Sequence, residues 1–404
     1  MILFFVRRYN DIDHTIPIVY RLAKDGYKDM AVLALDPEYD IANDFRLNFL
    51  KNQHGVEVDY VYRFFAPAII HKLFAWLLLQ NPISIWKRFI KHITFRYVFG
   101  FEWALSMFTE RKVSLVIFDW QEPKRYVTRS LFDAAKKLNI QRIGLPHGIS
   151  LYTNDMWTVS TFTKKKLPDF GNKWKNFEKI VVQFDHYKQT VARAGVPEEK
   201  LHVLGSTRFC SEWEGIYWVL VPRSKDYSGN GNPGKLKVVY MDHSPEYRIN
   251  VDVVLESIEK LSRLEFIDLV VKPSTASPDA VASRKLYELS QVDYKTSSVE
   301  LIRWADVVIG TTSSILIEPL LMKKIFIYPR YFHENTMLWD SMNACWTVNN
   351  YNELEDALRK IVDKPGYKRY SDRDVNKFIT EVVYGGVENR DVLGDYKKFI
   401  LSLI

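Results

Sequence analysis

The sequence predicts a protein of the α/β class, with doubly wound parallel sheets in two domains. The first observation is that short runs of β-branched and aromatic residues alternate with amphipathic helical patterns along the chain. The second is that these runs end in turns rich in charged and hydroxyl side chains, as parallel strands do where such sheets bind ligands. The third is size, because 404 residues with 47% hydrophobic content can bury two cores.

The clearest βαβ unit is the segment 304–329, WADVVIGTTSSILIEPLLMKKIFIYP. Val307–Ile309 is typical of a buried parallel strand, a helix is expected to follow, and Ile325–Tyr328 predicts the next strand. The turn between strand and helix is Gly310-Thr311-Thr312-Ser313-Ser314, whose hydroxyls and backbone N–H groups favour an anion such as a phosphate. Simple capping of the helix is the alternative interpretation. One turn further on, Glu318 is placed to reach a ribose hydroxyl.

The N-terminal segment predicts the β-α-β start of the first sheet. A strand is expected over Ile2–Val6, a helix up to about Ala23, and a second strand over Met30–Leu35. The polar turn after the first strand, where a doubly wound sheet binds ligands, holds Arg7, Arg8, Asn10, Asp11 and Asp13. An ordinary solvated turn is the alternative for these residues.

The segment 64–108 interleaves aromatic and aliphatic residues with lysines and arginines. This pattern is typical of helices that lie on a membrane surface, although core helices with solvated lysines explain it equally well. The net charge of +7 fits an anionic partner of this kind. A membrane surface is therefore a candidate partner, and we expect none among nucleic acids.

The lack of a signal-peptide pattern and the small number of cysteines predict a cytoplasmic protein. It is expected to be either soluble or peripheral at the inner membrane. The longest fully apolar run, Leu73–Leu79, is too short to span a bilayer. The N-terminus lacks the pattern of a signal peptide. Cys210 and Cys345 are too few and too far apart to indicate a disulfide framework or a cysteine metal site.

Two further strand ends of the first domain carry groups suited to proton transfer. A strand over Val113–Phe118 runs into Asp119 and Glu122, and a strand over Arg142–Leu145 runs into the turn that holds His147. Because parallel strands end at the same edge of a sheet, Glu122 and His147 are expected to serve a substrate hydroxyl together. Structural hydrogen bonding is the alternative for either residue.

Residues 222–235, PRSKDYSGNGNPGK, predict a linker, because they combine glycine, proline, serine and charge without an apolar period. The sequence thus indicates an N-terminal domain over 1–221 and a C-terminal domain over 236–404. The helical stretch 352–404 is a candidate to cross back and brace the first domain.

Polar groups also follow the strands of the second domain. The strand Lys237–Met241 ends in Asp242 and His243, and the strand Ile267–Val271 ends in Lys272. A third strand is expected over Val292–Lys295, and it runs into Ser297 and Ser298. Together with the 310–314 turn, these groups are expected along one edge of the second sheet as a ligand site.

Several of these motifs resemble those of a known family. The PHG turn at His147, the GSTRF turn that holds Arg208, the Lys272-Pro273 pair and ADVVIGTTSSILIEPLL look like the motifs of a GT-B glycosyltransferase. More narrowly, VVYMDHS, VVKPS and ADVVIGTTSSILIE are similar to bacterial retaining β-Kdo transferases of capsule and lipopolysaccharide assembly, which use CMP-β-Kdo. Lys272-Pro273 departs from the His-Pro pair of the capsule relatives.

The resemblance implies a GT-B fold, in which two Rossmann-like domains face a central cleft, and it implies roles for the residues named above. Asp242 matches the position of the proposed nucleophile, with His147 and Glu122 as further catalytic groups. The donor nucleotide is expected on His243, Lys272, Arg208 and Glu318 and on the hydroxyl residues Ser297, Ser298, Thr311, Thr312, Ser313 and Ser314. The glycan or glycolipid acceptor is expected on Arg7, Arg8 and Asp119.

The chemistry of such a donor is compatible with the sequence. CMP carries one phosphate, which hydroxyls and a lysine can hold without a metal that bridges a diphosphate. The expectation is therefore an enzyme with no metal and no cofactor. A carboxylate beside the anomeric carbon gives retention through two displacements.

Three other functions remain open on the same residues. A CDP-glycerol-type phosphotransferase would use the same hydroxyl turn but would need a base for attack on phosphorus. A non-hydrolysing epimerase of sugar nucleotides shares the fold and needs no acceptor. A non-catalytic scaffold of a surface-polysaccharide complex would bind nucleotide weakly or not at all.

Overall fold

The computed structural model describes the chain except for residues 37–38, 63–98, 121–125, 224–233 and 274–290. Glu122, most of the predicted linker and most of the aromatic and basic segment 64–108 therefore lie outside the described residues. Within the described part, no helix is both long enough and apolar enough to cross a membrane. Cys210 and Cys345 are both buried as free thiols.

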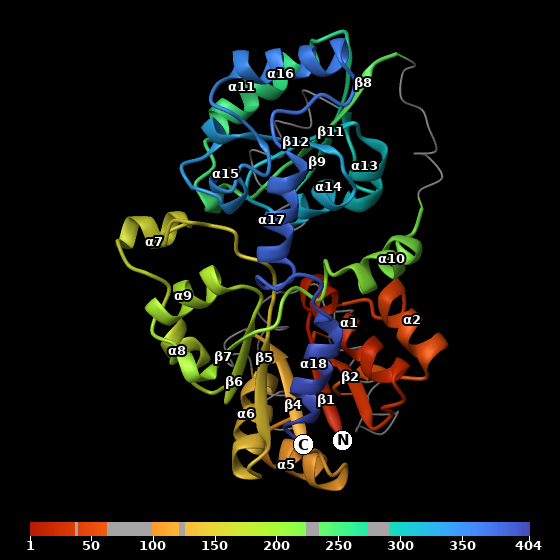
Figure 1. Ribbon diagram of the computed structural model, residues 1–404. Helices are drawn as coiled ribbons and strands as arrows, with labels where there is room; N and C mark the ends of the chain where they lie inside the picture. Colours follow the sequence, from red (N-terminus) through yellow and green to blue (C-terminus); the bar gives the residue numbers. More distant parts are fainter. Residues whose placement is uncertain (37–38, 63–98, 121–125, 224–233, 274–290) are drawn as a thin grey trace, which may run out of the picture. The chain divides into compact units, whose positions relative to one another are not determined.

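The described chain divides into two compact units, each built on its own parallel sheet (Figure 1). The first unit contains Met1–Ile149, Asp169–Leu220 and Val382–Ile404, and the second contains Ser150–Pro168 and Val221–Glu381. The sequence indicated one domain boundary, at residue 221, but residues 150–168 group with the second unit. The C-terminal residues from Val382 group with the first.

The first sheet has seven parallel strands in the order β3-β2-β1-β4-β5-β6-β7. Chain order reverses between β1 and β4, which places the switch point of a doubly wound sheet there. The strands are β1 Ile2–Val6, β2 Met30–Ala34, β3 Glu57–Tyr60, β4 Leu115–Asp119, β5 Gln141–Leu145, β6 Lys179–Val182 and β7 Leu201–Val203.

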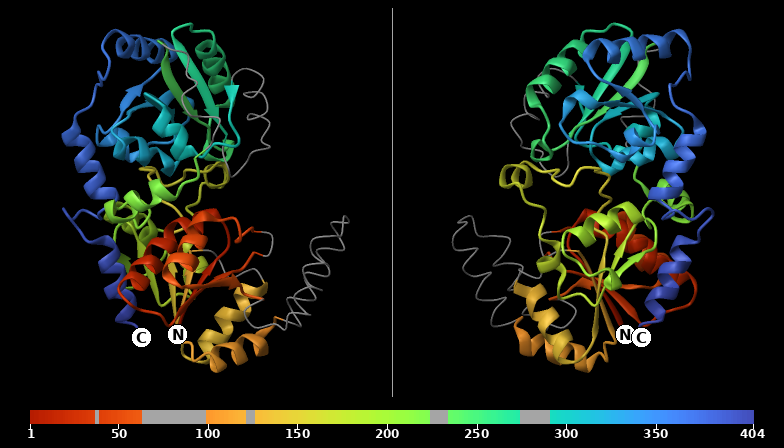
Figure 2. Two further views of the ribbon diagram at one scale, coloured as in Figure 1. Left: turned by 90° about the vertical axis from the view of Figure 1, so that its right-hand side faces the viewer. Right: turned by 60° about the vertical axis from the view of Figure 1, so that its left-hand side comes forward.

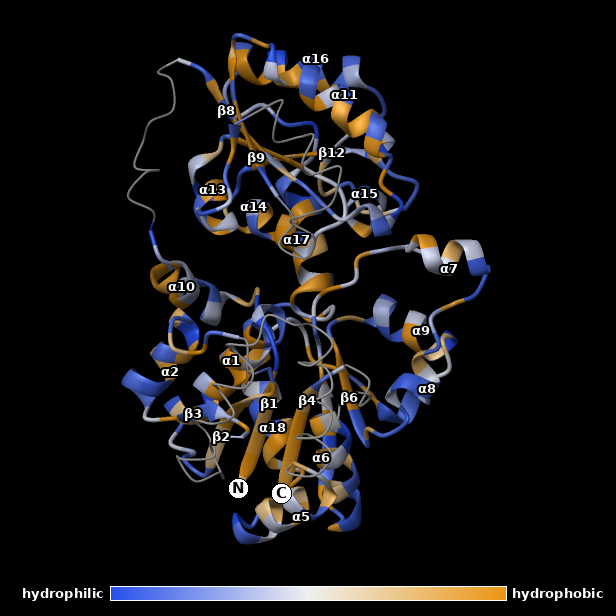
Figure 3. Ribbon diagram, turned by 180° about the vertical axis from the view of Figure 1, so that it is seen from behind, coloured by the Kyte–Doolittle hydropathy of each residue, from blue (hydrophilic) through white to orange (hydrophobic). Residues whose placement is uncertain are grey.

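The helices of the first unit cover this sheet. The bounds are α1 Tyr9–Lys24, α2 Phe45–His54, α5 Phe101–Glu110, α6 Tyr126–Lys137, α8 Phe170–Trp174, α9 Asp185–Arg193, η1 Glu198–Lys200, α10 Ser211–Leu220 and α18 Val392–Leu401. The central strands are buried on both faces and are hydrophobic along their length (Figure 3). Phe118 joins sheet to helix, because its ring stacks on Phe5 at 4.7 Å and on Phe132 of α6 at 4.4 Å.

The second sheet has six parallel strands in the order β10-β9-β8-β11-β12-β13, with its switch point between β8 and β11. The strands are β8 Leu236–Met241, β9 Ile267–Lys272, β10 Gln291–Val292, β11 Val307–Gly310, β12 Ile325–Pro329 and β13 Trp346–Val348. The helices are α7 Val159–Lys164, η3 Pro245–Tyr247, α11 Val251–Ser262, α13 Ser298–Trp304, η4 Ser314–Leu316, α14 Ile317–Leu321, η5 Arg330–Phe332, α15 Leu338–Ser341, α16 Tyr351–Asp363 and α17 Asp372–Val382.

Two predicted elements differ from the structure. The strand expected over Val292–Lys295 is only the two-residue β10 at Gln291–Val292, since Asp293 turns the chain by accepting from the N–H groups of Lys295 and Thr296 at 2.9 and 2.7 Å. The helix expected after the 310–314 turn begins instead as the short 3₁₀ helix η4 and continues as the five-residue α14. Pro319 lacks the N–H that a regular α-helix would donate back to Ile315, which explains the tighter first turn.

The C-terminal segment packs closely on the GSTRF turn of the first unit. Gly205 has φ +84°, and a Cβ at this position would lie 2.6 Å from the carbonyl oxygen of Val383. The N–H of Ser206 donates to that same oxygen at 2.7 Å, and the hydroxyl of Tyr396 donates to the carbonyl of Gly205 at 3.0 Å. The glycine therefore permits a close approach of two backbone segments.

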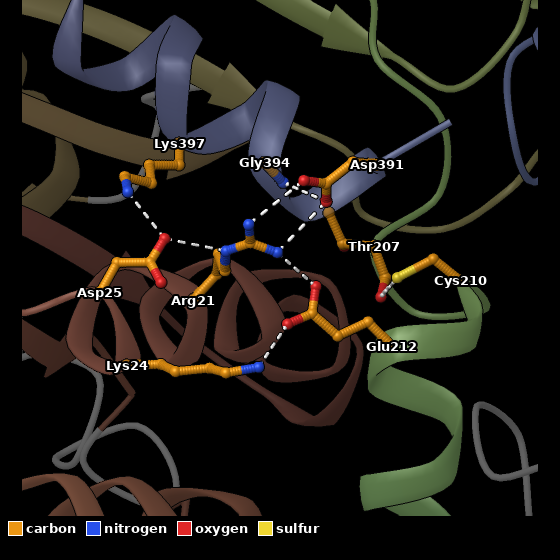
Figure 4. A network of polar contacts seen from close by, with 9 residues as sticks. All are labelled: Arg21, Lys24, Asp25, Thr207, Cys210, Glu212, Asp391, Gly394 and Lys397. Atoms are coloured by element: carbon orange, nitrogen blue, oxygen red, sulfur yellow. Dashed lines mark hydrogen bonds and ion pairs between the residues drawn. The ribbon is translucent and has the colours of Figure 1, made fainter. Parts of the chain in front are cut away.

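Helix α18 packs against α1 (Figure 2), and charged side chains join this region of the first unit (Figure 4). The guanidinium of Arg21 pairs with Asp25, Glu212 and Asp391 at 2.9, 2.7 and 3.1 Å. Lys397 of α18 pairs with Asp25 at 2.7 Å. Arg21 thus connects three stretches of the first unit that are distant in sequence.

Candidate functional site

The carboxyl edge of the first sheet brings four titratable or charged side chains together at its switch point. Arg7 follows β1, Asp119 ends β4 and His147 follows β5, and these three strands are neighbours in the sheet. Asp11 comes from the first turn of α1, which begins directly after the Arg7 turn. The order of the parallel strands is therefore what assembles this group.

His147 lies between the two carboxylates. Its Nδ1 is 2.6 Å from Oδ1 of Asp11 and 3.1 Å from Oδ2 of Asp119. Both aspartates are buried, whereas 39% of the His147 side chain is exposed. Because Nδ1 is engaged, Nε2 is the ring nitrogen left for a substrate.

Arg7 balances the charge of the two aspartates. Its backbone N–H donates to Oδ2 of Asp11 at 2.9 Å, and its Nη2 donates to Oδ1 of Asp11 at 3.2 Å and also to Asp119. With His147 protonated, the group holds two positive and two negative charges. Such a neutral group can be buried at a lower free-energy cost than an unbalanced one.

The pKa values within the group are shifted by burial and by the charges of its own members. Burial lowers the pKa of His147, but the hydrogen bonds to Asp11 and Asp119 outweigh it and raise that pKa to about 9. Burial raises the pKa of Asp11, yet His147 and Arg7 bring the net shift below the usual value. For Asp119, burial and then the charge of Asp11 leave the pKa raised. At neutral pH the imidazole is therefore mostly an imidazolium.

The same three residues could also hold a metal ion. Among the described residues, Asp11, Asp119 and His147 offer ligand atoms that all lie within 4.8 Å of one another. The guanidinium of Arg7 already contacts both carboxylates, and Nδ1 of His147 is bonded to them. A metal ion would have to displace one positive charge and deprotonate the other, so this group fits proton transfer better than metal binding.

The carboxyl edge of the second sheet holds another group, also at a switch point. Asp242 directly follows β8 and is 7% exposed, and its backbone N–H donates to the carbonyl of Lys272 at 2.9 Å. The hydroxyl of Tyr240 is 3.5 Å from Oδ1 of Asp242. Since Met241 pairs with Gly310, the 310–314 turn begins on the neighbouring strand at the same level as Asp242.

The 310–314 turn presents hydroxyls that are not used as helix caps. The hydroxyl of Thr311 is buried and makes no hydrogen bond with any described residue. Ser313 stands at the N-cap position of η4, but its side chain does not accept the capping bond. A buried hydroxyl without a partner is costly, so a ligand that completes its hydrogen bonds would be favoured there.

The helix behind this turn is shorter than the sequence suggested. With three residues in η4 and five in α14, it provides little of the macrodipole expected to favour a phosphate. An anion at the turn would depend on the hydroxyls and on the backbone N–H groups of the turn. Glu318, in the first turn of α14, is completely buried.

The helix that follows Asp242 is also too short to stabilise its carboxylate through a helix dipole. Ser244 and Pro245 do begin a helix, and the Ser244 hydroxyl accepts from the N–H of Glu246 at 3.4 Å. That helix, however, is the single 3₁₀ turn η3, while α11 begins only at Val251. The ionisation of Asp242 therefore cannot rest on a helix dipole.

Lys272 has a structural role in the described residues. Its ammonium donates to the backbone carbonyls of Asp293, Tyr294 and Thr296 at 3.2, 3.3 and 2.6 Å. All three ammonium protons are thereby used within the protein, and burial lowers the pKa of Lys272. The structure thus places this lysine as a clamp on the 293–296 turn, where the sequence suggested a phosphate contact.

Several other predicted residues make local contacts. Ser297 caps α13 by accepting from the N–H of Glu300 at 3.1 Å, and Ser298 is the first residue of that helix. Arg8 is exposed, and its Nε is 3.1 Å from Asp36. Arg208 is buried against the ring of Tyr217 and lies 3.3 Å from Asp13. It belongs to the first unit, whereas the other residues predicted to bind the donor belong to the second.

His243 belongs to an aromatic group that the sequence did not suggest. Its ring packs edge-on against Tyr247 at 4.6 Å, and Tyr247 lies parallel to Tyr152, which stacks on Trp157. Burial lowers the pKa of His243 to about 4, so its ring is neutral at physiological pH. Tyr152 and Trp157 come from the 150–168 segment, which the sequence assigned to the first domain.

The sequence placed Asp11 in the polar turn where a doubly wound sheet binds ligands, but it did not predict that Asp11 contacts His147. A signal was present, because Asp11 stands four residues after Arg7 at the start of a helix, where the two side chains lie on one face. Its contact with His147 across 136 positions could not be recognised from local pattern.

No protein-family profile matches the chain, and neither does any curated protein sequence. Among solved structures, UDP-GlcNAc 2-epimerase from Neisseria meningitidis bound to UDP-GlcNAc is similar, with TM-score 0.60, 12% identity and coverage of 99% of this chain and 98% of that chain.

Two other solved structures are similar over comparable lengths. UDP-GlcNAc 2-epimerase from Methanocaldococcus jannaschii, in complex with UDP-GlcNAc and UDP, has TM-score 0.56 and 11% identity, with coverage of 94% and 98%. A glycosyltransferase from Rickettsia africae has TM-score 0.54 and 14% identity, with coverage of 100% and 97%. The chain has the GT-B fold. The GT-B fold predicted from the sequence, with its two Rossmann-like sheets, is thus confirmed. At 11–14% sequence identity these similarities show a shared fold.

Proposed function

We propose that this GT-B protein is a glycosyltransferase that moves β-Kdo from CMP-β-Kdo to a surface-polysaccharide acceptor with retention. The observation that carries the proposal is the edge of the second sheet, where Asp242 and the hydroxyl turn at Thr311 end neighbouring strands. One carboxylate next to hydroxyls that do not cap a helix suits a donor with a single phosphate and a reactive anomeric carbon. The similarity to two structures of the same fold that bind UDP-GlcNAc supports a nucleotide sugar as the donor class.

In the first step of this reaction, an Oδ atom of Asp242 attacks the anomeric carbon. The bond from that carbon to the phosphate oxygen breaks, and CMP leaves with the electron pair. In the second step, the acceptor oxygen displaces Asp242 from the opposite face, which regenerates the carboxylate and restores the original configuration. The hydroxyls of the 310–314 turn would bind the phosphate, without any need for a metal.

The acceptor hydroxyl loses a proton in the second step, and His147 is the group proposed to receive it on Nε2. Asp11 and Asp119 would hold the ring in place through Nδ1 and stabilise the imidazolium that forms. Because the pKa of His147 is raised to about 9, transfer should become faster as the pH increases toward that value.

The test is to trap the glycosyl-enzyme. Wild-type protein is incubated with CMP-Kdo without acceptor, quenched in acid, digested and analysed by peptide mass spectrometry. We expect one Kdo residue on the peptide that contains Asp242, and none in Asp242→Asn. The Asp242→Asn protein should retain its melting temperature and its stabilisation by CMP. An adduct on another residue, or near-normal transfer by Asp242→Asn, would refute the assignment.

A second candidate is an epimerase of a UDP-sugar, which the similarity to the two 2-epimerase structures favours. Such a reaction needs acid–base groups rather than a nucleophile, and the His147 group is of that kind. Incubation with UDP-GlcNAc and no acceptor, followed by NMR of the sugar in deuterated water, separates the two. Epimerisation with deuterium at C2 would establish this alternative and exclude the transferase.

A further inference from the structure

The short helix α7 carries exposed apolar and basic side chains at the end of a segment that is fixed to the second unit. Val159 and Phe162 of α7 are 46% and 47% exposed, and they lie three positions apart on one side of the helix. Lys164, Lys165 and Lys166 follow at its C-terminal end, and all three are exposed. From Trp157 to Pro168 the chain contains no acidic residue.

The base of α7 is built to hold these side chains in place. Thr158 and Thr161 form a reciprocal capping box at its N-terminus. The guanidinium of Arg248 lies 4.1 Å from the centre of the Phe162 ring, and it is itself held by Glu334 and by the carbonyl of Met156. One face of the Phe162 ring is thus supported by a fixed cation, while nearly half of the side chain remains exposed.

The three lysines stand where the helix ends, and all three are exposed. Lys165 adopts a left-handed conformation with φ 47°, which terminates α7 and turns the chain there. The three lysines thus stand two to four positions after Phe162 in the chain. Figure 3 shows hydrophobic and hydrophilic residues side by side along α7.

We propose that α7 and the following lysines, residues 159–166, are a docking surface for an anionic lipid bilayer. Lysines that flank a small exposed apolar group are the pattern by which peripheral proteins bind anionic headgroups and insert a ring at the boundary of the acyl chains. A stable protein partner would require about 800 Å² on each side, and two apolar side chains on one short helix do not provide such an area. The net charge of +7 acts in the same direction, because it attracts the whole molecule to an anionic surface.

The test is flotation of the full chain with vesicles of phosphatidylcholine alone, and with vesicles that contain 30% phosphatidylglycerol. We expect binding to the anionic vesicles only, and weaker binding in high salt. Replacing Lys164, Lys165 and Lys166 together by alanine should lower the partition coefficient on the order of 100-fold, since each lysine near the surface contributes roughly five-fold. Phe162→Ala should lower it roughly 3- to 10-fold.

A matched variant separates this surface from general charge. Lys364, Arg369 and Lys377 lie in the same unit, and all three are exposed. Replacing them together by alanine removes the same net charge, and we expect the partition coefficient to fall less than ten-fold. Val219 of α10 is 82% exposed, and Val219→Ser is the control for loss of an exposed apolar side chain.

The outcomes are decisive in either direction. Equal binding of wild-type protein to neutral and anionic vesicles, or no binding to either, would overturn the proposal. It would also fail if both triple variants lost the same affinity, or if the Lys164–Lys166 variant bound like wild type. Unchanged melting temperatures of all variants would show that the differences come from the surface and not from unfolding.

Discussion

Oδ1 of Asp11 lies 2.6 Å from Nδ1 of His147, although 136 positions separate the two residues in the chain. Asp11 is almost completely buried and is fixed by the backbone N–H of Arg7 at 2.9 Å, so it acts as a positioning residue for the imidazole. Because His147 binds two carboxylates at one nitrogen, the other nitrogen is presented with a defined orientation. This relationship is the strongest link between the fold of the first unit and proton transfer.

Asp11→Asn should lower the pKa of His147 from about 9 toward its usual 6.5, because the variant removes the carboxylate nearest to Nδ1. The pKa is measured by NMR titration of the ring. In the proposed transfer reaction, the rise of the rate with pH should move to lower pH by the same amount. Asp133→Asn removes an equal charge at an exposed position of α6 and should shift neither.

The same shift makes stability depend on pH. The folded pKa of His147 lies above its unfolded value of about 6.5, so its contribution is fully present below pH 6.5 and is lost as pH rises through about 9. Denaturant unfolding between pH 6 and 10 should show this loss in wild type and a smaller one in Asp11→Asn. Identical pH dependence of the two proteins would contradict the coupling of Asp11 to His147.

Thr311→Val should have opposite effects on the free protein and on nucleotide binding. The Thr311 hydroxyl is buried without a partner among the described residues, so replacing it by a methyl group should stabilise the free protein by about 1 kcal/mol. If the hydroxyl binds the phosphate, the rise in melting temperature with CMP, measured in EDTA, should become smaller.

Thr296→Val provides the control for this experiment. The Thr296 hydroxyl donates to Asp293 at 2.7 Å, so its loss should destabilise the protein by about 1 kcal/mol and leave the response to CMP unchanged. A full CMP response in Thr311→Val would remove this hydroxyl from the donor site. A strict requirement for Mg²⁺ would count against a CMP-sugar.

Lys272→Met should destabilise the protein by about 2 kcal/mol, because three backbone carbonyls would lose their donor. Its affinity for CMP, measured by calorimetry below the melting temperature, should remain close to that of wild type. Lys295→Met, at an exposed position of the same turn, should change neither quantity. Loss of CMP binding in Lys272→Met alone would restore the phosphate role that the sequence suggested.

Gly205→Ala should destabilise the first unit by about 2–4 kcal/mol, because the new Cβ meets the Val383 carbonyl and the backbone is in the left-handed region. Gly26→Ala is the matched control, since Gly26 has φ +90° but no atom within 4 Å of its Cβ position. That variant should lose only about 1 kcal/mol. Equal losses, measured by denaturant unfolding, would show that contact with the C-terminal segment contributes nothing.

The sequence by itself determined most of the strands and the polar residues that follow them. The strands β1, β8 and β11 were recognised within one residue at each end, because a buried parallel strand needs a short run of β-branched and aromatic residues. The turns after those strands identified Arg7, Asp242 and Thr311, since a doubly wound sheet binds ligands at the carboxyl ends of its strands. All of this information is local in the chain.

Only the tertiary structure decided which of these residues meet. Whether the Lys272 ammonium contacts a ligand or three carbonyls depends on a turn 21 to 24 residues further along the chain. The hydrophobic pattern of the sequence does not predict that contact. The contact of Asp11 with His147 follows from the order of strands in the sheet, and that of Gly205 with Val383 from where the C-terminal segment packs. Local propensity determines backbone dihedral angles over a few residues. Contacts between distant residues form instead when whole faces of helices and sheets are buried against one another, and the free energy of that burial depends on the complete fold.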